Sequence, residues 1–280
     1  SNQNNYVAGK AEGLLILSEC QNLRDHVLAL KTAQASLSLS SSIDHKRGMA
    51  DAHVAIGEYQ MAQHNLEECA KSLEAALNIY RNLNDAVEQA EVLIYFGYIG
   101  YRNGDWQGAL NYYTQAESMI DKNAEPYRMG QITIGLGDSF LESGMPEVAL
   151  PKYEESLEYF RITHDRRAMS ILKWSIGRAK YFSGQYEGAI DSLETARGEA
   201  HASGDITLTA FCDDFLGRAY HSKNDHAAAL SHFQSAFDGY SKAKNTREAT
   251  RAQALMGRVY QQQGRLQKAR ENYQTALATF

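Results

Sequence analysis

Six glycines recur at intervals of 40 residues, and this register constrains the fold more than any other feature of the chain. No insertion or deletion interrupts the series, which consists of Gly57, Gly97, Gly137, Gly177, Gly217 and Gly257. Self-similarity at a fixed period of this length is typical of stacked supersecondary units. The chain is therefore predicted to be an array, in which each residue can be compared with its equivalents in the other units.

Small and apolar residues follow each glycine on the same lattice. The positions 12 and 19 residues later are small, as at Ala109 and Ala116, and the position 16 later is large and apolar, as at Tyr113. These spacings follow the 3.6-residue period of one helix face. The glycine belongs to an earlier helix, where it is expected to allow close approach of the second helix, with the small residue 12 later opposite. Each unit is thus predicted to be a helix pair.

Turn residues separate the two predicted helices of most units. Seven residues after the glycine the chain has Gly104, Gly144, Gly184, Asn224 and Gly264, all tolerant of a positive φ. Between units, Asp85, Asp165 and Asp205 are suitable helix N-caps. A phosphate-cradling role for the glycines would need a preceding strand, and the pattern contains none.

Seven units of 40 residues account for the whole length of 280. Extrapolation backward places Leu17 at the glycine position and Ala29 and Ser36 at the small positions, so the first unit, about residues 6–44, is degenerate. Regular units cover about residues 45–280. Because stacked repeats share a continuous core, residues 1–280 are predicted to form a single solenoid domain.

The lattice resembles the tetratricopeptide repeat. The glycine of the first helix, the two small residues of the second and the intervening aromatic residue match, and the tyrosine three after the glycine is present at Tyr220 and Tyr260. The usual unit has 34 residues and ends in proline, whereas this chain has 40-residue units and three prolines in all. The longer unit is similar to Pins-type adaptors, kinesin light chains and MalT- or Rap-type regulatory arms. The resemblance implies an all-α, right-handed superhelical solenoid of seven helix pairs.

Composition limits the function classes. A net charge of −6 argues against nucleic-acid binding, and no apolar run is long enough for a membrane span. Cys20, Cys69 and Cys212 fall on lattice positions that are mostly apolar elsewhere, so they are interpreted as core residues in a reducing, cytoplasmic compartment.

No motif for catalysis or cofactor binding is present, so the chain is expected to be neither an enzyme nor a cofactor protein. The nearest metal candidate is the set His221, His226 and His232, but these histidines have no ligand spacing and are interpreted as surface or boundary residues.

The candidate binding residues lie on the face of the first helix opposite its predicted core, which we call the open face. It comprises the positions six, three and two before the glycine and one and five after it, and in the family this face lines the concave groove. Its large apolar and charged residues, with their neighbours, predict a peptide-binding site formed by Tyr95, Tyr98, Tyr101, Arg102, Asp138, Trp174, Arg178, Tyr181, Asp214, Phe215, Arg218 and Arg258. Aromatic residues and arginines are enriched at binding hot spots.

Charge on this face changes sign along the chain. Acidic residues such as Glu58 and Asp138 precede arginines at equivalent positions, Arg178, Arg218 and Arg258. The expected partner is therefore a protein or peptide with acidic and apolar residues. Two alternatives stay open: part of the face is buried against the array itself, or the arginines pair with Asp213 and Asp214.

Family pockets give no closer identification of the partner. The lysine and asparagine of the chaperone-binding carboxylate clamp are absent, and so is the asparagine ladder of Pins-type adaptors. The main alternative function is a regulatory or self-association arm of a larger signalling or transcription-regulatory protein. In its support, the lattice ends on the apolar Phe280 without a polar cap, which predicts self-association through the C-terminal end.

Overall fold

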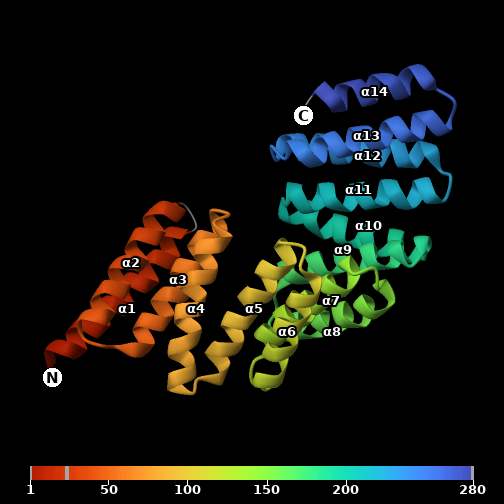
Figure 1. Ribbon diagram of the computed structural model, residues 1–280. Coiled ribbons are helices and arrows are strands. Elements are labelled where there is room, and N and C mark those ends of the chain that lie inside the picture. Colours follow the sequence, from red (N-terminus) through yellow and green to blue (C-terminus); the bar gives the residue numbers. More distant parts are fainter. Residues whose placement is uncertain (1, 23–24, 279–280) are drawn as a thin grey trace. The chain divides into compact units, whose positions relative to one another are not determined.

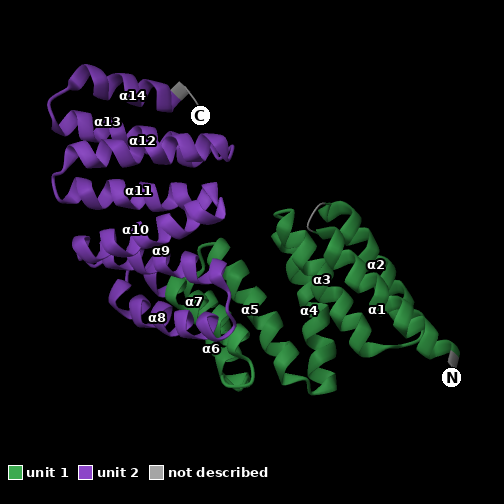
Figure 2. Ribbon diagram, turned by 180° about the vertical axis from the view of Figure 1, so that it is seen from behind, with its two compact units in different colours: residues 1–139 green, residues 140–280 purple. Residues whose placement is uncertain are grey.

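The computed structural model describes residues 2–22 and 25–278, in which it contains fourteen α-helices and no β-strand (Figure 1). This number agrees with the seven predicted helix pairs. The chain divides into two compact units, residues 1–139 and 140–280 (Figure 2). The single solenoid domain over residues 1–280 stays a prediction.

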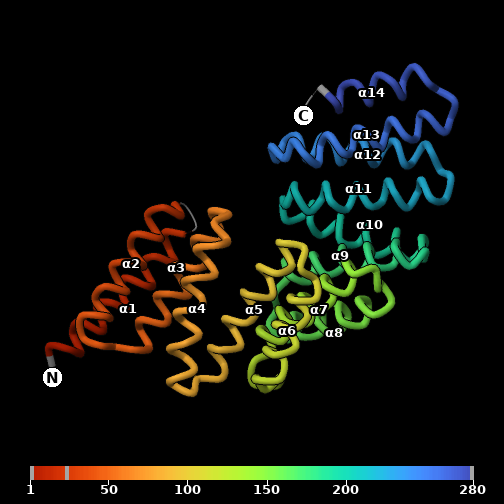
Figure 3. The backbone as a smooth tube through the Cα atoms, in the orientation of Figure 1, coloured from red at the N-terminus to blue at the C-terminus, as the bar shows by residue number. Residues whose placement is uncertain are grey.

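Unit 1 contains six whole helices and most of a seventh. They are α1 (Asn2–Asn22), α2 (His26–Ser42), α3 (Lys46–Ala62), α4 (Leu66–Leu83), α5 (Ala86–Arg102), α6 (Trp106–Met119) and α7 (Pro126–Glu142), whose last residues belong to unit 2. Within this unit α1 packs on α2, α3 on α4 and α5 on α6, each pair antiparallel (Figure 3).

Unit 2 repeats the arrangement with seven further helices. They are α8 (Pro146–Ile162), α9 (Arg166–Phe182), α10 (Tyr186–Ser203), α11 (Ile206–Ser222), α12 (His226–Lys242), α13 (Thr246–Gln262) and α14 (Leu266–Ala278). Here α9 packs on α10, α11 on α12 and α13 on α14. The odd-numbered helices are thus the first helices of the predicted pairs.

The turns have the predicted backbone conformation. Gly104 and Asn224, seven residues after their lattice glycines, have φ values of +78° and +63°. The carboxylates of Asp165 and Asp205 accept hydrogen bonds from the backbone N–H groups of Ala168 and Leu208, both at 2.9 Å, and Asp85 caps α5 in the same way. The predicted N-caps are therefore confirmed.

The lattice glycines make room for a large side chain rather than a small one. A Cβ atom built on Gly217 would lie 2.6 Å from the ring of Phe233, and one on Gly177 would lie 2.6 Å from Leu193. Both neighbours are the large residues 16 positions later. The small residue 12 later contributes only a more distant contact. At Gly177 the backbone oxygen of Ala189 lies 3.4 Å from the built Cβ atom, so the expectation that this residue lies opposite the glycine is correct only in part.

The first pair differs from the lattice at α1. Ala29 and Ser36 are buried as expected, but Leu17, at the glycine position, is 47% exposed. Ser18 is buried instead, within 2.9 Å of the Tyr59 hydroxyl, and Ser36 donates to the carbonyl of Ala11. A leucine cannot fit where a glycine allows close approach, so α1 presents its small residues to α2 and α3.

This different register of α1 also corrects one cysteine assignment. Cys69 and Cys212 are buried, but Cys20 is exposed because the lattice face of α1 is turned outward. All three are free thiols. Burial raises the pKa of Cys69 to about 11, which keeps this thiol protonated and unreactive.

The lattice is predicted to end on an apolar face at Phe280. Phe280 lies outside the described residues, whereas Leu277 on α14 is 72% exposed. No helix of the described residues is both long and apolar enough to span a bilayer.

Candidate binding surface

The open face of the odd-numbered helices is only partly open. The residue one after the glycine is half-buried in the five 40-residue repeats from Glu58 to Arg218 and is exposed at Arg258. The residue five after the glycine is exposed in most repeats. The position two before the glycine is buried in four of the six regular repeats, including Phe215. The assignment of this position to the open face was therefore wrong, because it faces the neighbouring helices.

In unit 2 the aromatic residues of this face gather around Phe215. The ring centroids of Trp174, Tyr181 and Phe182 lie 6.1, 5.8 and 6.0 Å from that of Phe215. Phe211 extends the group through Trp174, at 5.5 Å. Phe182 is 53% exposed, so the aromatic cluster reaches solvent at this ring.

Two arginines are stacked on the aromatic cluster. The guanidinium carbon of Arg178 lies 4.7 Å from the Trp174 ring centroid and 5.6 Å from that of Phe215. Arg218 lies 5.2 Å from the Phe215 ring. Such cation–π contacts fix the orientation of the guanidinium groups.

The same arginines are engaged in ion pairs within the unit. Arg178 donates to Glu142 at 2.6 Å, and Arg218 donates to Asp214 at 3.0 Å. Asp214 is fully buried and also accepts from Arg251 at 3.1 Å. The sequence alternative of arginines paired with Asp214 thus holds for Arg218, and Asp214 supports the surface from below.

The neighbouring Asp213 belongs to a separate polar group. It accepts from Arg197 and lies 2.8 Å from His232 Nδ1. Arg258 is exposed on α13 and makes no ion pair with any residue that the structure describes.

In unit 1 three candidate residues surround one hollow. Tyr95, Tyr98 and Arg102 line a cavity of about 490 Å³ beside Glu58, between α3, α5 and the end of α1. Tyr95 donates a hydrogen bond to Glu58, and Arg102 donates to the Tyr98 hydroxyl at 2.7 Å.

The other two candidates of unit 1 do not line this cavity. The Tyr101 ring lies 5.3 Å from that of Trp106, so Tyr101 joins the turn that follows α5. Asp138 is half-buried on α7.

Burial controls the electrostatics of this hollow. Desolvation raises the pKa of Glu58, with smaller contributions from the negative charges of Glu91 and Glu19, and the Tyr95 hydrogen bond opposes the shift. Desolvation together with the Glu58 charge also raises the pKa of Tyr95 well above its usual value. The Tyr95–Glu58 pair therefore joins a neutral phenol to a carboxyl group in a poorly solvated place.

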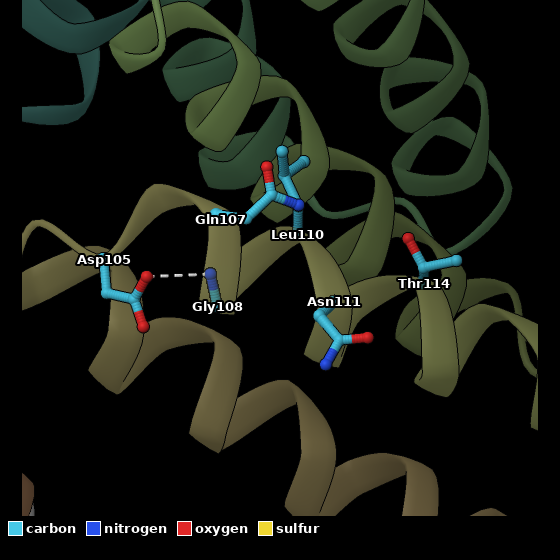
Figure 4. Close-up of a pocket in the computed structure, with 6 residues that line it drawn as sticks. All are labelled: Asp105, Gln107, Gly108, Leu110, Asn111 and Thr114. Atoms are coloured by element: carbon cyan, nitrogen blue, oxygen red, sulfur yellow. Dashed lines mark hydrogen bonds between the residues drawn. The ribbon is translucent and has the colours of Figure 1, made fainter.

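Two other hollows lie away from the predicted site. Figure 4 shows one on α6, about 470 Å³ in volume, where Asp105 accepts from the backbone N–H of Gly108 at 2.9 Å. The second, of about 820 Å³, lies at the start of α9, where Glu199 already accepts from Ser170 and Lys173. In both hollows these polar groups are already hydrogen-bonded to other residues of the chain.

The histidines do not come together as a metal site. The rings of His221 and His226 lie 5.8 Å apart, whereas His232 is bound to Asp213. Within residues 2–22 and 25–278, no group of three or more His, Cys, Asp or Glu side chains is arranged to hold a metal ion.

Comparisons with known proteins agree with the architecture. The tetratricopeptide repeat family model matches residues 207–280. The search of curated proteins finds no match. One similar solved structure is the apo form of RapI, with 15% identity and a TM-score of 0.66 over 82% of this chain and 97% of that chain.

Two further solved structures are similar. A Rap protein complexed with Competence and Sporulation Factor has 14% identity and a TM-score of 0.63, over 99% of this chain and 97% of that one. A STAND protein with a tetratricopeptide repeat sensor from Pyrococcus horikoshii has 19% identity and a TM-score of 0.71, over 89% of this chain and 38% of that one. The chain has the tetratricopeptide-repeat fold, and the resemblance to this superfamily, Rap proteins included, is confirmed.

Sequence reasoning placed Phe182 and Phe211 on the correct helix face but did not connect them with Phe215. The connection depends on ring positions in different helices, which a lattice of spacings does not contain. The hollow beside Glu58 was also missed, because Asn22, Met61 and His64 line it from positions outside the open face.

Proposed function

We propose that this chain is a protein-interaction module that binds a peptide or protein segment on the open face of its odd-numbered helices. The observation that carries the proposal is the aromatic cluster around Phe215, which reaches solvent at Phe182 beside two arginines of fixed orientation. Apolar rings next to arginine are the usual anchors of a binding hot spot. A Rap protein of similar fold is known in complex with Competence and Sporulation Factor.

The proposal gives different roles to the candidate residues. Phe182, Trp174 and Tyr181 supply apolar contact area, while Arg178 and Arg218 supply positive charge beside these rings. Asp214 holds Arg218 in place without contacting the partner, and Arg258 is the cation best able to meet an acidic residue. A reducing, cytoplasmic setting and a non-catalytic role complete the proposal, because Cys69 and Cys212 are buried free thiols and the fold is typical of scaffolds.

Selection from a random peptide library displayed on phage tests this function. The most enriched peptide should bind the wild-type chain, and Phe182→Ser should weaken that binding by about tenfold or more. Because Phe182 is half exposed, the melting temperature should stay nearly constant. The matched control is Ile162→Ser on α8, which removes a 63% exposed apolar side chain elsewhere and should leave the affinity unchanged. Equal binding by both variants would contradict the proposal.

A regulatory or self-associating arm is the second candidate. It is favoured by the exposed face of α14, where Leu266 and Leu277 are 67% and 72% exposed, and by the likeness to a STAND protein's repeat sensor. Light scattering should show a mass that rises with concentration for the wild-type chain, and Leu277→Glu should abolish the rise. A wild-type mass that is independent of concentration would exclude self-association through this face.

A further inference from the structure

The hollow beside Glu58 in unit 1 has a half-buried carboxylate at its wall. Glu58 on α3 lines the cavity of about 490 Å³ together with Met61, His64 and three residues of α5, which are Tyr95, Tyr98 and Arg102. A cavity of this volume is within the range of ligand pockets, about 300–1,000 Å³.

Glu58 lacks a cation, unlike several other carboxylates that the fold covers. Asp213 is paired with Arg197, Asp214 with Arg218 and Arg251, and Glu91 with Arg128. No lysine or arginine of the described residues lies within 4 Å of the Glu58 carboxylate, whose hydrogen-bond partner is the neutral Tyr95 hydroxyl. A desolvated carboxylate without a counter-ion lowers the stability of the folded state.

The surroundings of Glu58 favour a positive ligand. Glu91 and Glu19 add negative potential at the carboxylate, and Tyr95 and Tyr98 bring two aromatic rings to the same cavity. Aromatic rings attract cations, and guanidinium groups stack on rings elsewhere in this chain, as Arg178 does on Trp174. A planar guanidinium can bind a carboxylate and stack on a ring at the same time, which an ammonium group does less well.

We propose that this hollow receives an arginine side chain of a bound protein segment, with its guanidinium on Glu58 and against the tyrosine rings. The inference rests on the proposed function and assigns a basic residue to the partner in addition to the acidic and apolar ones. Arg102 does not fill the place itself. Its guanidinium donates to the Tyr98 hydroxyl at 2.7 Å and is exposed at the edge of the cavity.

Methyl NMR with ¹³C-labelled methionine provides the test, because Met61 lines the hollow and Met129, buried on α7, serves as an internal reference. The probe is N-acetyl-arginine amide at constant pH and ionic strength, compared with the lysine, norleucine and glutamate amides. We expect a saturable shift of the Met61 signal with the arginine amide, a weaker response to lysine and none to norleucine or glutamate. Met129 should not respond.

Two variants decide whether Glu58 is responsible. Glu58→Gln should weaken binding of the arginine amide by about tenfold or more, because a charge-assisted hydrogen bond is lost. Glu74→Gln, an exposed change on α4 of the same unit, should have no effect. A Met61 signal that does not respond to the arginine amide, that responds equally to norleucine, or that keeps its response in Glu58→Gln would overturn the proposal.

The melting temperature of Glu58→Gln shows whether a loss of binding could come from a loss of folding. Since the folded-state pKa of Glu58 is raised, its stabilising contribution is complete below the unfolded-state pKa and is lost as the pH rises through the folded-state pKa. Glu58→Gln removes this loss, so at a pH above the folded-state pKa of Glu58 it should melt above the wild-type chain. A lower melting temperature would show that the carboxylate already has a stabilising partner within the chain, which also overturns the proposal.

The outcome separates this inference from the proposed function. If the phage-selected peptide depends on Phe182 but the arginine amide does not bind, the chain is an interaction module without an arginine site. If the arginine amide binds through Glu58 and no peptide depends on Phe182, the site stands and the aromatic cluster has another role.

Discussion

Arg218→Glu is expected to lower the free energy of unfolding by about 3–5 kcal/mol, the usual cost of breaking a buried ion pair. Arg218 donates to Asp214 at 3.0 Å, and Asp214 is fully buried on the same helix, α11. A glutamate at this position would place a second negative charge one helical turn from the first. Arg251, which also pairs with Asp214, can compensate for only part of the loss.

The matched control is Arg258→Glu at the equivalent position of α13. Arg258 is exposed and forms no ion pair with a described residue, so the same charge reversal should change stability by less than about 0.5 kcal/mol. Chemical denaturation of both variants gives the comparison. Equal stability losses would mean that the Arg218–Asp214 pair contributes nothing particular to the fold.

This pair of variants also guides binding experiments. A loss of partner binding in Arg218→Glu would be ambiguous, because the fold of unit 2 is affected. Arg258→Glu reports on binding alone. Of the three arginines that share one lattice position, only Arg258 can therefore test the expected acidic partner directly.

Gly217→Ala should destabilise the chain by about 1–3 kcal/mol through overpacking. The new Cβ would lie 2.6 and 2.7 Å from two ring carbons of Phe233, which is 1% exposed and cannot move aside without displacing its neighbours. This loss must exceed the gain of up to about 1 kcal/mol that alanine brings to a helix interior.

Gly198→Ala, also in unit 2, is expected to have the opposite effect on stability. Gly198 lies within α10, and no atom comes within 4 Å of the position that its Cβ would take. The substitution should therefore raise stability by about 0.5–1 kcal/mol. Thermal melts that move in the same direction for both variants would contradict the packing role of the lattice glycines.

The sequence was sufficient to predict the helix pairs, because each unit repeats the same information. The 3.6-residue period identified the buried face of the second helices, and turn residues identified their ends, as at Gly104 and Asp205. The period did not determine how each first helix is rotated about its axis. A small rotation moved Leu17 outward and placed Phe215 inward.

The hydrophobic period also could not predict which side chains of successive first helices make contact. Arg251 pairs with Asp214, Tyr95 with Glu58 and Arg128 with Glu91, and each pair is separated by 37 residues. This separation is three residues shorter than the 40-residue repeat, so it joins positions on adjacent first helices. The lattice contains that separation, but which side chains are long enough to meet depends on the side-chain positions in the structure.

The central claim is that the open face of the odd-numbered helices binds a segment of a partner. Hydrogen–deuterium exchange of the chain with and without the phage-selected peptide tests it most directly. The account predicts added protection in the C-terminal halves of α9 and α11, which carry Phe182, Arg178 and Arg218. Protection confined to α10 and α12, with α9 and α11 unchanged, would contradict it.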